Sequence, residues 1–230
     1  MIFEPLVIDG HTLPVRLRTH PKSRRLTLRL AADGASLNVV APPGLKAAEI
    51  RRFLDTHRPW IAERLGRLAP RVPFAEGSLI PLLGVPHRVV HAPTARRGVW
   101  TADGQIHISG HPEHLPRRLA DWLRAQARAE ITPRVHQMAA RLGKTPGRIT
   151  LRDPTSRWGS CAANGNLAFS WRLILAPDYV LAYVVAHEVA HLAHLNHGPR
   201  FHTTVRQLIA NPTPARQWLK THGPTLHRFG

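Results

Sequence analysis

Cysteine and long hydrophobic runs are scarce in this chain of 230 residues, and each scarcity excludes a class of protein. The single cysteine, Cys161, cannot form a disulfide within the chain. No apolar run approaches the roughly 18 residues that a membrane-spanning helix needs, which argues against an integral membrane protein. Residues 1–10 carry Glu4 and Asp9 where a signal peptide would carry basic residues before an apolar stretch, so we expect a cytoplasmic protein without a membrane partner.

Acidic residues are also few, because 14 aspartates and glutamates face 32 lysines and arginines, which gives a formal net charge of +18. Lysine occurs only at positions 22, 46, 144 and 220, so nearly all of the basic residues are arginine. A surface this basic attracts polyanions, and nonspecific contact with nucleic acid is one interpretation of it. The charge is spread over both halves without a block, which also fits an arginine-rich composition that serves no binding face.

The first half of the chain has the short alternating patterns of β-strands. Leu26, Leu28 and Leu30 are apolar at every second position, which predicts a strand with one buried face. From Lys46 to about residue 69 apolar residues recur at helical spacing, and Pro59 is expected to kink or divide this helical stretch. Short β-type runs then return, so residues 1–110 are predicted to form a β-rich region with one helical excursion.

The second half, residues 111–230, is predicted to be mainly helical. A long helix is expected to begin between residues 112 and 116, and Pro133 is expected to bend or break it. Asn164-Gly165 is a strong hairpin-turn pair, and an apolar helix is predicted over residues 179 to about 194. Strands grouped before helices favour an α+β fold, in which a β-rich N-terminal region precedes a helical domain that contains a small β-hairpin sheet.

Residues 187–191 form an H-E-x-x-H motif within that apolar helix. Histidines at positions i and i+4 lie about 40° apart around a helix and about 6 Å apart along it, so His187 and His191 can reach one ion. Neutral imidazoles suit zinc, and a catalytic zinc keeps one coordination position open for water. Glu188 is then placed to accept a proton from that water, which makes it the predicted general base. The alternative is an exposed helix face that carries these residues by chance.

A catalytic zinc needs a third protein ligand, and His194, His197 and His202 are the candidates. If the helix continued, His194 would lie about 10 Å along its axis from the first histidine of the motif, too far to share one ion. A turn in the left-handed conformation at Asn196 would instead bring His197 back over the helix end. The resulting spacing of five residues after His191 matches the ligand spacing of metzincin peptidases, so we predict His197 as the third ligand.

Several short stretches between residues 156 and 202 resemble the YgjP-like family of bacterial metal-dependent hydrolases, which is grouped with the SprT-like zinc metallopeptidases. They are Ser156-Arg157-Trp158-Gly159-Ser160-Cys161, Asn164-Gly165-Asn166-Leu167, Trp171-Arg172-Leu173-Ile174, the H-E-x-x-H motif and Asn196-His197. The resemblance implies a zincin-like metallopeptidase domain over residues 111–230. It also implies one zinc ion, bound by His187, His191 and His197, with Glu188 as the catalytic base.

Two borders of the predicted site have more than one interpretation. Gly198 and His202 stand where the family commonly has serine and tryptophan, so the wall of the cleft is expected to differ while His197 stays in place. Arg157 could stabilise an oxyanion or bind a phosphate group of the substrate. In the alternative interpretation the whole stretch is structural, and Gly159 only permits a tight bend.

The same residues fit three functions. We predict a zinc-dependent metallohydrolase, and first of all a metallopeptidase that acts on peptide or protein substrates. One alternative is a pyrophosphohydrolase of nucleoside triphosphates such as UTP, which the arginine excess favours and the absence of an acidic cluster for Mg²⁺ disfavours. The other alternative is a basic nucleic-acid-associated module with a metal site, in which Glu188 would have no purpose.

Overall fold

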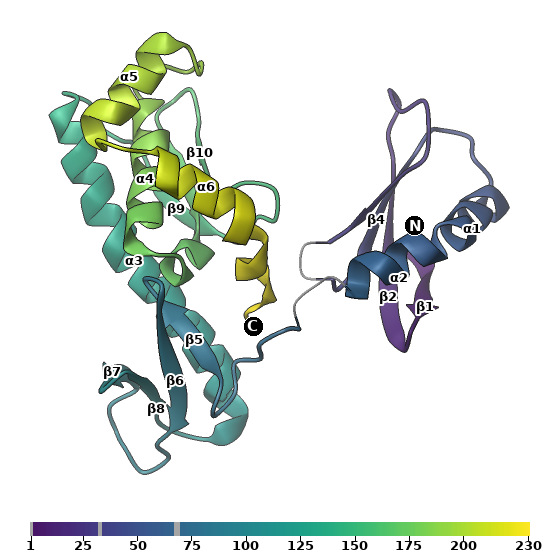
Figure 1. Cartoon of the computed structure of the whole chain (residues 1–230), viewed down its shortest axis with the longest axis horizontal. Coiled ribbons are helices and arrows are strands. Elements are labelled where there is room, and N and C mark those ends of the chain that lie inside the picture. The colour runs from purple at the N-terminus through teal and green to yellow at the C-terminus, as the bar shows by residue number, and fades with distance from the viewer. Residues whose placement is uncertain (1, 32–33, 67–69) are drawn as a thin grey trace. The chain divides into compact units, whose positions relative to one another are not determined.

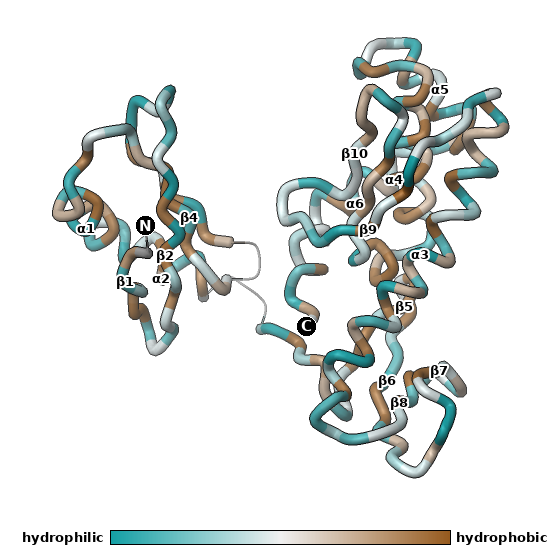
Figure 2. The backbone as a smooth tube through the Cα atoms, turned by 180° about the vertical axis from the view of Figure 1, so that it is seen from behind, coloured by the Kyte–Doolittle hydropathy of each residue, from teal (hydrophilic) through white to brown (hydrophobic). Residues whose placement is uncertain are grey.

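The computed structural model describes residues 2–31, 34–66 and 70–230, and it divides into two compact units, Met1–Arg71 and Val72–Gly230 (Figure 1). Both units combine strands with helices, so the predicted α+β fold class is confirmed. Each unit has a hydrophobic core of its own. Hydrophobic stretches accordingly follow strands and helices in both of them (Figure 2).

The first unit is a four-stranded sheet with two helices. Its elements are β1 (Ile2–Ile8), β2 (His11–Thr19), β3 (Thr27–Leu30), β4 (Leu37–Ala41), α1 (Ala47–Thr56) and α2 (Arg58–Gly66). The strand order is β1-β2-β4-β3, with the parallel pair β2–β4 at the centre and antiparallel pairs on either side. The helical stretch is divided as predicted, with the break at His57 and Pro59 in the first turn of α2. Ile50, Leu54 and Ile61 of the two helices complete the core of this sheet.

The second unit begins with a sheet of the same connectivity. It consists of β5 (Leu79–Leu82), β6 (Val85–His91), β7 (Val99–Ala102) and β8 (Gln105–Ile108). The order is β5-β6-β8-β7, again with a central parallel pair, β6–β8. In both sheets the first hairpin turns through two residues of positive φ, Asp9-Gly10 (46° and 79°) and Leu83-Gly84 (49° and 82°). Positive φ at both central residues is the geometry of the tight turn that suits the twist of a hairpin.

The rest of the second unit is a three-stranded sheet among helices. Its elements are η1 (Pro112–His114), α3 (Leu115–Arg141), β9 (Ile149–Arg152), β10 (Gly159–Cys161), β11 (Leu167–Ser170), η2 (Trp171–Leu175), α4 (Asp178–Ala190), α5 (Pro199–Leu208), α6 (Thr213–His222) and η3 (Gly223–Arg228). The predicted hairpin at Asn164-Gly165 joins β10 to β11, and β11 pairs in parallel with β9. α3 packs along α4 (Figure 1), and β10, at the sheet edge, also contacts α4.

The observed division between the units differs from the predicted boundary at residue 110. The chain divides after residue 71, because β5–β8 belong to the core of the second unit. Ile80 and Ile106 of this sheet are fully buried in the same cluster as Leu119 and Leu123 of α3. The sequence signals a change from strands to helices near residue 110, but a core that both elements share makes them one unit.

Pro133 does not break its helix, because α3 continues through this residue from Leu115 to Arg141; a bend at Pro133 stays a prediction. Proline removes one backbone hydrogen bond and crowds the preceding turn. Ile131 and Val135, on either side of Pro133, are fully buried, and their packing holds the helix together across the lost bond. None of the helices in the described parts of the chain combines the length and the apolarity that crossing a bilayer requires.

Candidate metal centre

The end of α4 places the first two residues of the H-E-x-x-H motif. α4 is surrounded by other elements, so most of its residues are buried. His187 is half-buried and the Glu188 side chain lies in the interior, with 6% of the residue exposed. Burying a charged carboxylate costs free energy unless the carboxylate is paired or takes up a proton. The chance alternative, an exposed helix face, is therefore wrong for Glu188.

The chain reverses after α4 by a different route from the one that the sequence predicted. The helix ends at Ala190 rather than near residue 194. After it the chain forms 3₁₀-type hydrogen bonds, in which an amide donates to the carbonyl three residues earlier, such as Ala193 N to Ala190 O (3.1 Å). Asn196 does not adopt a positive φ, so the predicted left-handed turn is wrong. The next helix, α5, begins at Pro199, because proline is well suited to the first turn of a helix.

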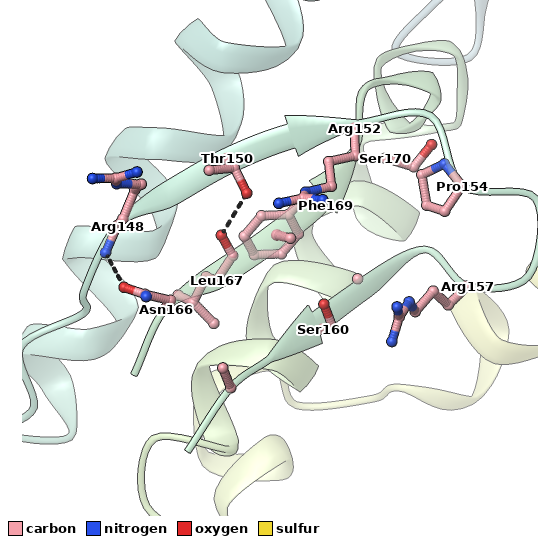
Figure 3. Close-up of a pocket in the computed structure, with 13 residues that line it drawn as sticks. Arg148, Thr150, Arg152, Pro154, Arg157, Ser160, Asn166, Leu167, Phe169 and Ser170 are labelled. Atoms are coloured by element: carbon pink, nitrogen blue, oxygen red, sulfur yellow. Dashed lines mark hydrogen bonds between the residues drawn. The ribbon is translucent and has the colours of Figure 1, made fainter. Parts of the chain in front are cut away.

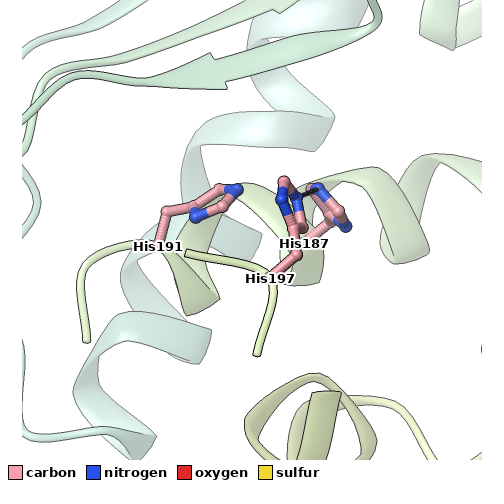
Figure 4. A group of neighbouring side chains, drawn as sticks. All are labelled: His187, His191 and His197. Atoms are coloured by element: carbon pink, nitrogen blue, oxygen red, sulfur yellow. Dashed lines mark hydrogen bonds between the residues drawn. The ribbon is translucent and has the colours of Figure 1, made fainter. Parts of the chain in front are cut away.

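This reversal brings His197 beside His187 and His191 (Figure 4). One ring nitrogen from each of the three lies within 4.8 Å of the others, and the Nε2 atoms of His187 and His197 are 3.1 Å apart. Two imidazoles that each lie about 2.0–2.1 Å from a tetrahedral zinc ion have their nitrogens roughly 3.3 Å apart, so the spacing of His187 and His197 suits such an ion. The cluster does not include His194 or His202.

The backbone after α4 orients one of the three rings. Nδ1 of His191 lies 3.0 Å from the carbonyl oxygen of His194. A carbonyl only accepts hydrogen bonds, so Nδ1 of His191 is the nitrogen that carries the proton, and its Nε2 keeps a free lone pair. Histidines that bind metals in proteins are usually held in this way through their second nitrogen. His194 therefore contributes to the cluster through its main chain, a role that side-chain spacing alone does not predict.

The Phe201 ring packs against all three imidazoles, a contact that was not predicted from the sequence. Only 1% of this residue is exposed. Its ring centroid lies 5.0 Å from that of His187, 4.5 Å from that of His191 and 4.7 Å from that of His197. An apolar ring at this distance restricts the rotation of the histidines, so it holds them close to one geometry. An aromatic residue at the start of a helix gives no local signal of this role.

Burial favours the neutral form of His187 and His191, which is the form that binds a metal. It lowers the pKa of His187 to about 4, and the neighbouring charges of His191 and His197 act in the same direction. Burial also lowers the pKa of His191, although its hydrogen bond to the backbone opposes the effect. Arg216 is a further group whose charge lowers the pKa of His187, so its guanidinium acts on the site electrostatically.

The side chain of Glu188 lies against the edge strand β10. Burial raises the pKa of Glu188 to about 7, and the charge of Arg157 partly opposes this rise. A Cβ atom at position 159 would lie 2.5 Å from Cγ and 2.6 Å from Oε1 of Glu188, so only glycine leaves room for the carboxyl group in this position. Gly159 lies in β10, and it is this close approach rather than a tight bend that requires it.

Cys161, in the same edge strand, is not part of the histidine cluster. It is half-buried, and its side chain packs against the hydrophobic core of the second unit. Burial raises the pKa of the Cys161 thiol, and the nearby charge of Glu188 raises it further. The protonated thiol is a poor metal ligand, so the cysteine behaves as a small apolar residue here.

Two cavities lie near the site: the first is lined by Gly159, and the second is lined by residues of the histidine cluster. One, of about 340 Å³, lies over the three-stranded sheet and includes Gly159; Arg148 and Arg152 lie on its β9 side, and Arg157 lies on its β10 side (Figure 3). The predicted substrate residue Arg157 is thus exposed at the rim of a cavity next to Glu188. The other cavity, of about 680 Å³, is lined by two of the three histidines together with residues of α4, α5 and α6.

Residues 24–222 match the family model described as "YgjP-like, metallopeptidase domain". The crystal structure of the metallopeptidase zymogen of Pyrococcus abyssi abylysin is similar with a TM-score of 0.36 and 16% sequence identity, over 40% of this chain and 95% of that one. No curated protein matches the sequence. The family model covers most of the chain, and a metallopeptidase family implies a hydrolase that uses a metal ion. This protein therefore belongs to the YgjP-like family of metallopeptidase domains.

Proposed function

We propose that the protein is a zinc-dependent metallopeptidase whose ion is bound by His187, His191 and His197. The observation that carries the proposal is the approach of three imidazole nitrogens to within 4.8 Å of one another beside a buried carboxyl group. Three neutral histidines are a typical ligand set of catalytic zinc, and structural zinc sites usually have four protein ligands. One zinc ion per chain is expected.

A zinc ion held there would supply a Lewis acid that polarises a carbonyl group and favours the ionisation of water. Glu188 is the proposed general base, which takes a proton from the attacking water and passes it to the leaving amine. Gly159 lets the carboxyl group of Glu188 stay in place for both transfers, because nothing at this position in β10 pushes it aside. Arg157, whose charge acts on Glu188, is proposed to bind the substrate or to stabilise its developing negative charge.

A peptide or protein substrate is favoured over the alternatives by the family description. The hydrolysis of UTP and a role as a nucleic-acid-associated module stay predictions without further support. A cytoplasmic location likewise stays a prediction. A UTP hydrolase would release pyrophosphate, and a nucleic-acid-associated module would bind nucleic acid without hydrolysing peptides. One set of assays can therefore separate both from a peptidase.

The test compares the wild-type protein with Glu188→Gln in the hydrolysis of casein and of fluorogenic peptides. We expect Glu188→Gln to lower peptide hydrolysis by roughly 10²–10⁴-fold, as for the loss of a general base, while bound zinc is unchanged. Glu113→Gln is the matched control, because Glu113 is exposed and belongs to η1. Equal hydrolysis by wild type and Glu188→Gln would contradict the proposal, and pyrophosphate release from UTP without peptide cleavage would favour the nucleotide alternative.

A further inference from the structure

We propose that the 680 Å³ cavity beside the histidines binds a carboxylate group of the substrate, so that the protein prefers peptides with a negative charge close to the bond it hydrolyses. The preference rests on the proposed peptidase function, but the binding of the carboxylate does not. The cavity is lined by His187 and His197 on one side. A group that occupies it is therefore held next to the reacting atoms.

Two arginines give this cavity its charge. Arg206 of α5 and Arg216 of α6 line it, and no aspartate or glutamate is among the described residues that do. Arg206 donates a long hydrogen bond of 3.4 Å to the Thr203 hydroxyl. None of the ion pairs formed by the described part of the chain involves either arginine. Both guanidinium groups are exposed to solvent and are free to bind an anion.

Two other arginines of the second unit are paired with carboxylates within the fold. Arg134 contacts Glu130 at 2.8 Å and Asp178 at 2.7 Å, so its charge is neutralised within the fold. Arg172 pairs with Asp153 at 2.6 Å. The chain has only 14 acidic residues, and these carboxylates form ion pairs that connect different segments of the second unit. Arg206 and Arg216 have no such ion pair, so their charges are not neutralised by a carboxylate of the described residues.

The chemistry of the lining points to a carboxylate on an aliphatic stem. A guanidinium group donates two parallel hydrogen bonds to a carboxylate, and this geometry makes arginine the usual partner of such groups. Pro199, Phe201, Val205 and Pro212 contribute apolar surface to the same cavity, which suits the methylene groups of a side chain. The carboxylate comes either from an acidic side chain of the substrate or from its C-terminus.

The experiment measures the binding of fluorescein-labelled hexapeptides to zinc-loaded Glu188→Gln protein by fluorescence anisotropy. The peptides are built from alanine and glycine and carry glutamate, glutamine or lysine at each position in turn, each with a C-terminal amide or a free carboxylate. We expect one glutamate position, or the free C-terminus, to bind on the order of tenfold more tightly than its neutral counterpart. If glutamate tightens binding in the peptides with a C-terminal amide, the cavity binds a side-chain carboxylate. If only the free C-terminal carboxylate tightens binding, the cavity binds the C-terminus.

Variants of the two arginines, made in the same Glu188→Gln background, connect this gain to the cavity. Arg206→Gln and Arg216→Gln should each remove most of it, and Arg216→Glu should shift the preference from glutamate to lysine. Arg200→Gln is the matched control, because Arg200 is an exposed arginine of the same helix α5 that does not line the cavity. Thermal unfolding of each variant shows that it has the wild-type fold.

The outcomes separate this inference from the proposed function. Peptides that bind equally whatever their charge, or a preference that survives both Arg216→Gln and Arg206→Gln, would overturn the carboxylate site, even if the wild-type protein hydrolyses peptides. Charge-selective binding that both variants remove supports the site, even if no peptide is ever hydrolysed. Hydrolysis by the wild-type protein should show the same preference in kcat/KM.

Discussion

Two sheets of the same connectivity are used in different ways in this molecule. β1-β2-β4-β3 is completed by α1 and α2, and the core that they form contains none of the candidate site residues. β5-β6-β8-β7 shares its core with α3, β11 and α4, and α4 carries the H-E-x-x-H motif. The comparison teaches that the topology of these sheets does not decide where the chemistry lies. What differs is that the second sheet shares its core with the helix that carries the motif.

The second sheet also reaches the start of the helix that carries the site. The Leu83 amide donates a hydrogen bond of 2.7 Å to the Ile174 carbonyl, just before α4. A Cβ atom at Gly84 would lie 2.9 Å from Cα of Pro177, so this hairpin turn fits closely against the helix start. The corresponding turn of the first sheet, at Gly10, has open space at the same point. The hairpin of the second sheet is therefore a support of α4.

The largest effect is expected at the contact between β10 and Glu188. Gly159→Ala would place a methyl group against the Glu188 carboxyl group and displace it, so we expect peptide hydrolysis to fall roughly 10²–10³-fold while zinc stays bound. Gly66→Ala in the first unit, where nothing lies within 4 Å of the added atom, is the control and should be neutral. Full activity of Gly159→Ala would show that the position of Glu188 does not depend on β10.

Core substitutions in the two sheets should separate the units. Leu37 and Ile106 are both fully buried, so Leu37→Ala and Ile106→Ala should each cost about 2–5 kcal/mol of unfolding free energy in their own unit. Only Ile106→Ala is expected to lower the temperature at which zinc and activity are lost, because its core includes α4. Thermal unfolding followed in parallel with activity measures this. Equal loss of activity in both variants would mean that the site depends on both sheets.

A smaller, pH-dependent effect is expected at the ion pair that fastens the C-terminal segment. Arg172 contacts Asp153 and also donates hydrogen bonds to the carbonyls of Leu226 (3.1 Å) and Phe229 (2.7 Å). Burial opposes ionisation of Asp153, but the hydrogen bonds and charge of Arg172 outweigh it and lower the pKa of Asp153 below its ordinary value of 3.8. The carboxylate therefore stabilises the fold above about pH 4, and this contribution is lost as the pH falls through the lowered pKa.

Asp153→Asn tests this contribution. Because Asp153 is 42% exposed, we expect the substitution to cost only about 1 kcal/mol at neutral pH. The difference in unfolding free energy between wild type and Asp153→Asn should shrink toward zero as the pH approaches about 2. Urea unfolding at several pH values measures it. A difference that stays constant over this range would mean that the asparagine acts through packing rather than through charge.

Local patterns predicted the parts of the site that lie on one helix. The helical repeat alone places His187 and His191 on one face, and the hairpin at Asn164-Gly165 follows from its turn chemistry. His197 was predicted beside them, but by a left-handed turn at Asn196 that the structure does not use. Several different turns can bring a residue five positions beyond a helix end back to that helix. The set of ligands is therefore more predictable from the sequence than the backbone conformation between them.

Contacts between distant segments could not be predicted from the sequence. The role of Gly159 depends on Glu188, which lies 29 positions later, and the packing of Phe201 against the imidazoles depends on how α5 folds back. The boundary after residue 71 depends on a core shared by β5–β8 and α3, and no periodicity within either element reveals it. The similarity of the two sheets is likewise invisible in the sequence, because connectivity and not residue identity is repeated.

Elemental analysis of the purified protein tests most directly whether three histidines of the second unit hold one ion. We expect about one zinc per chain in the wild type, with His197→Ala losing most of it under mild chelation. His194→Ala should retain the ion, because the main-chain carbonyl of His194 and not its ring contacts His191. Zinc that is absent from the wild type, or that His197→Ala binds as tightly as His194→Ala, would contradict the account.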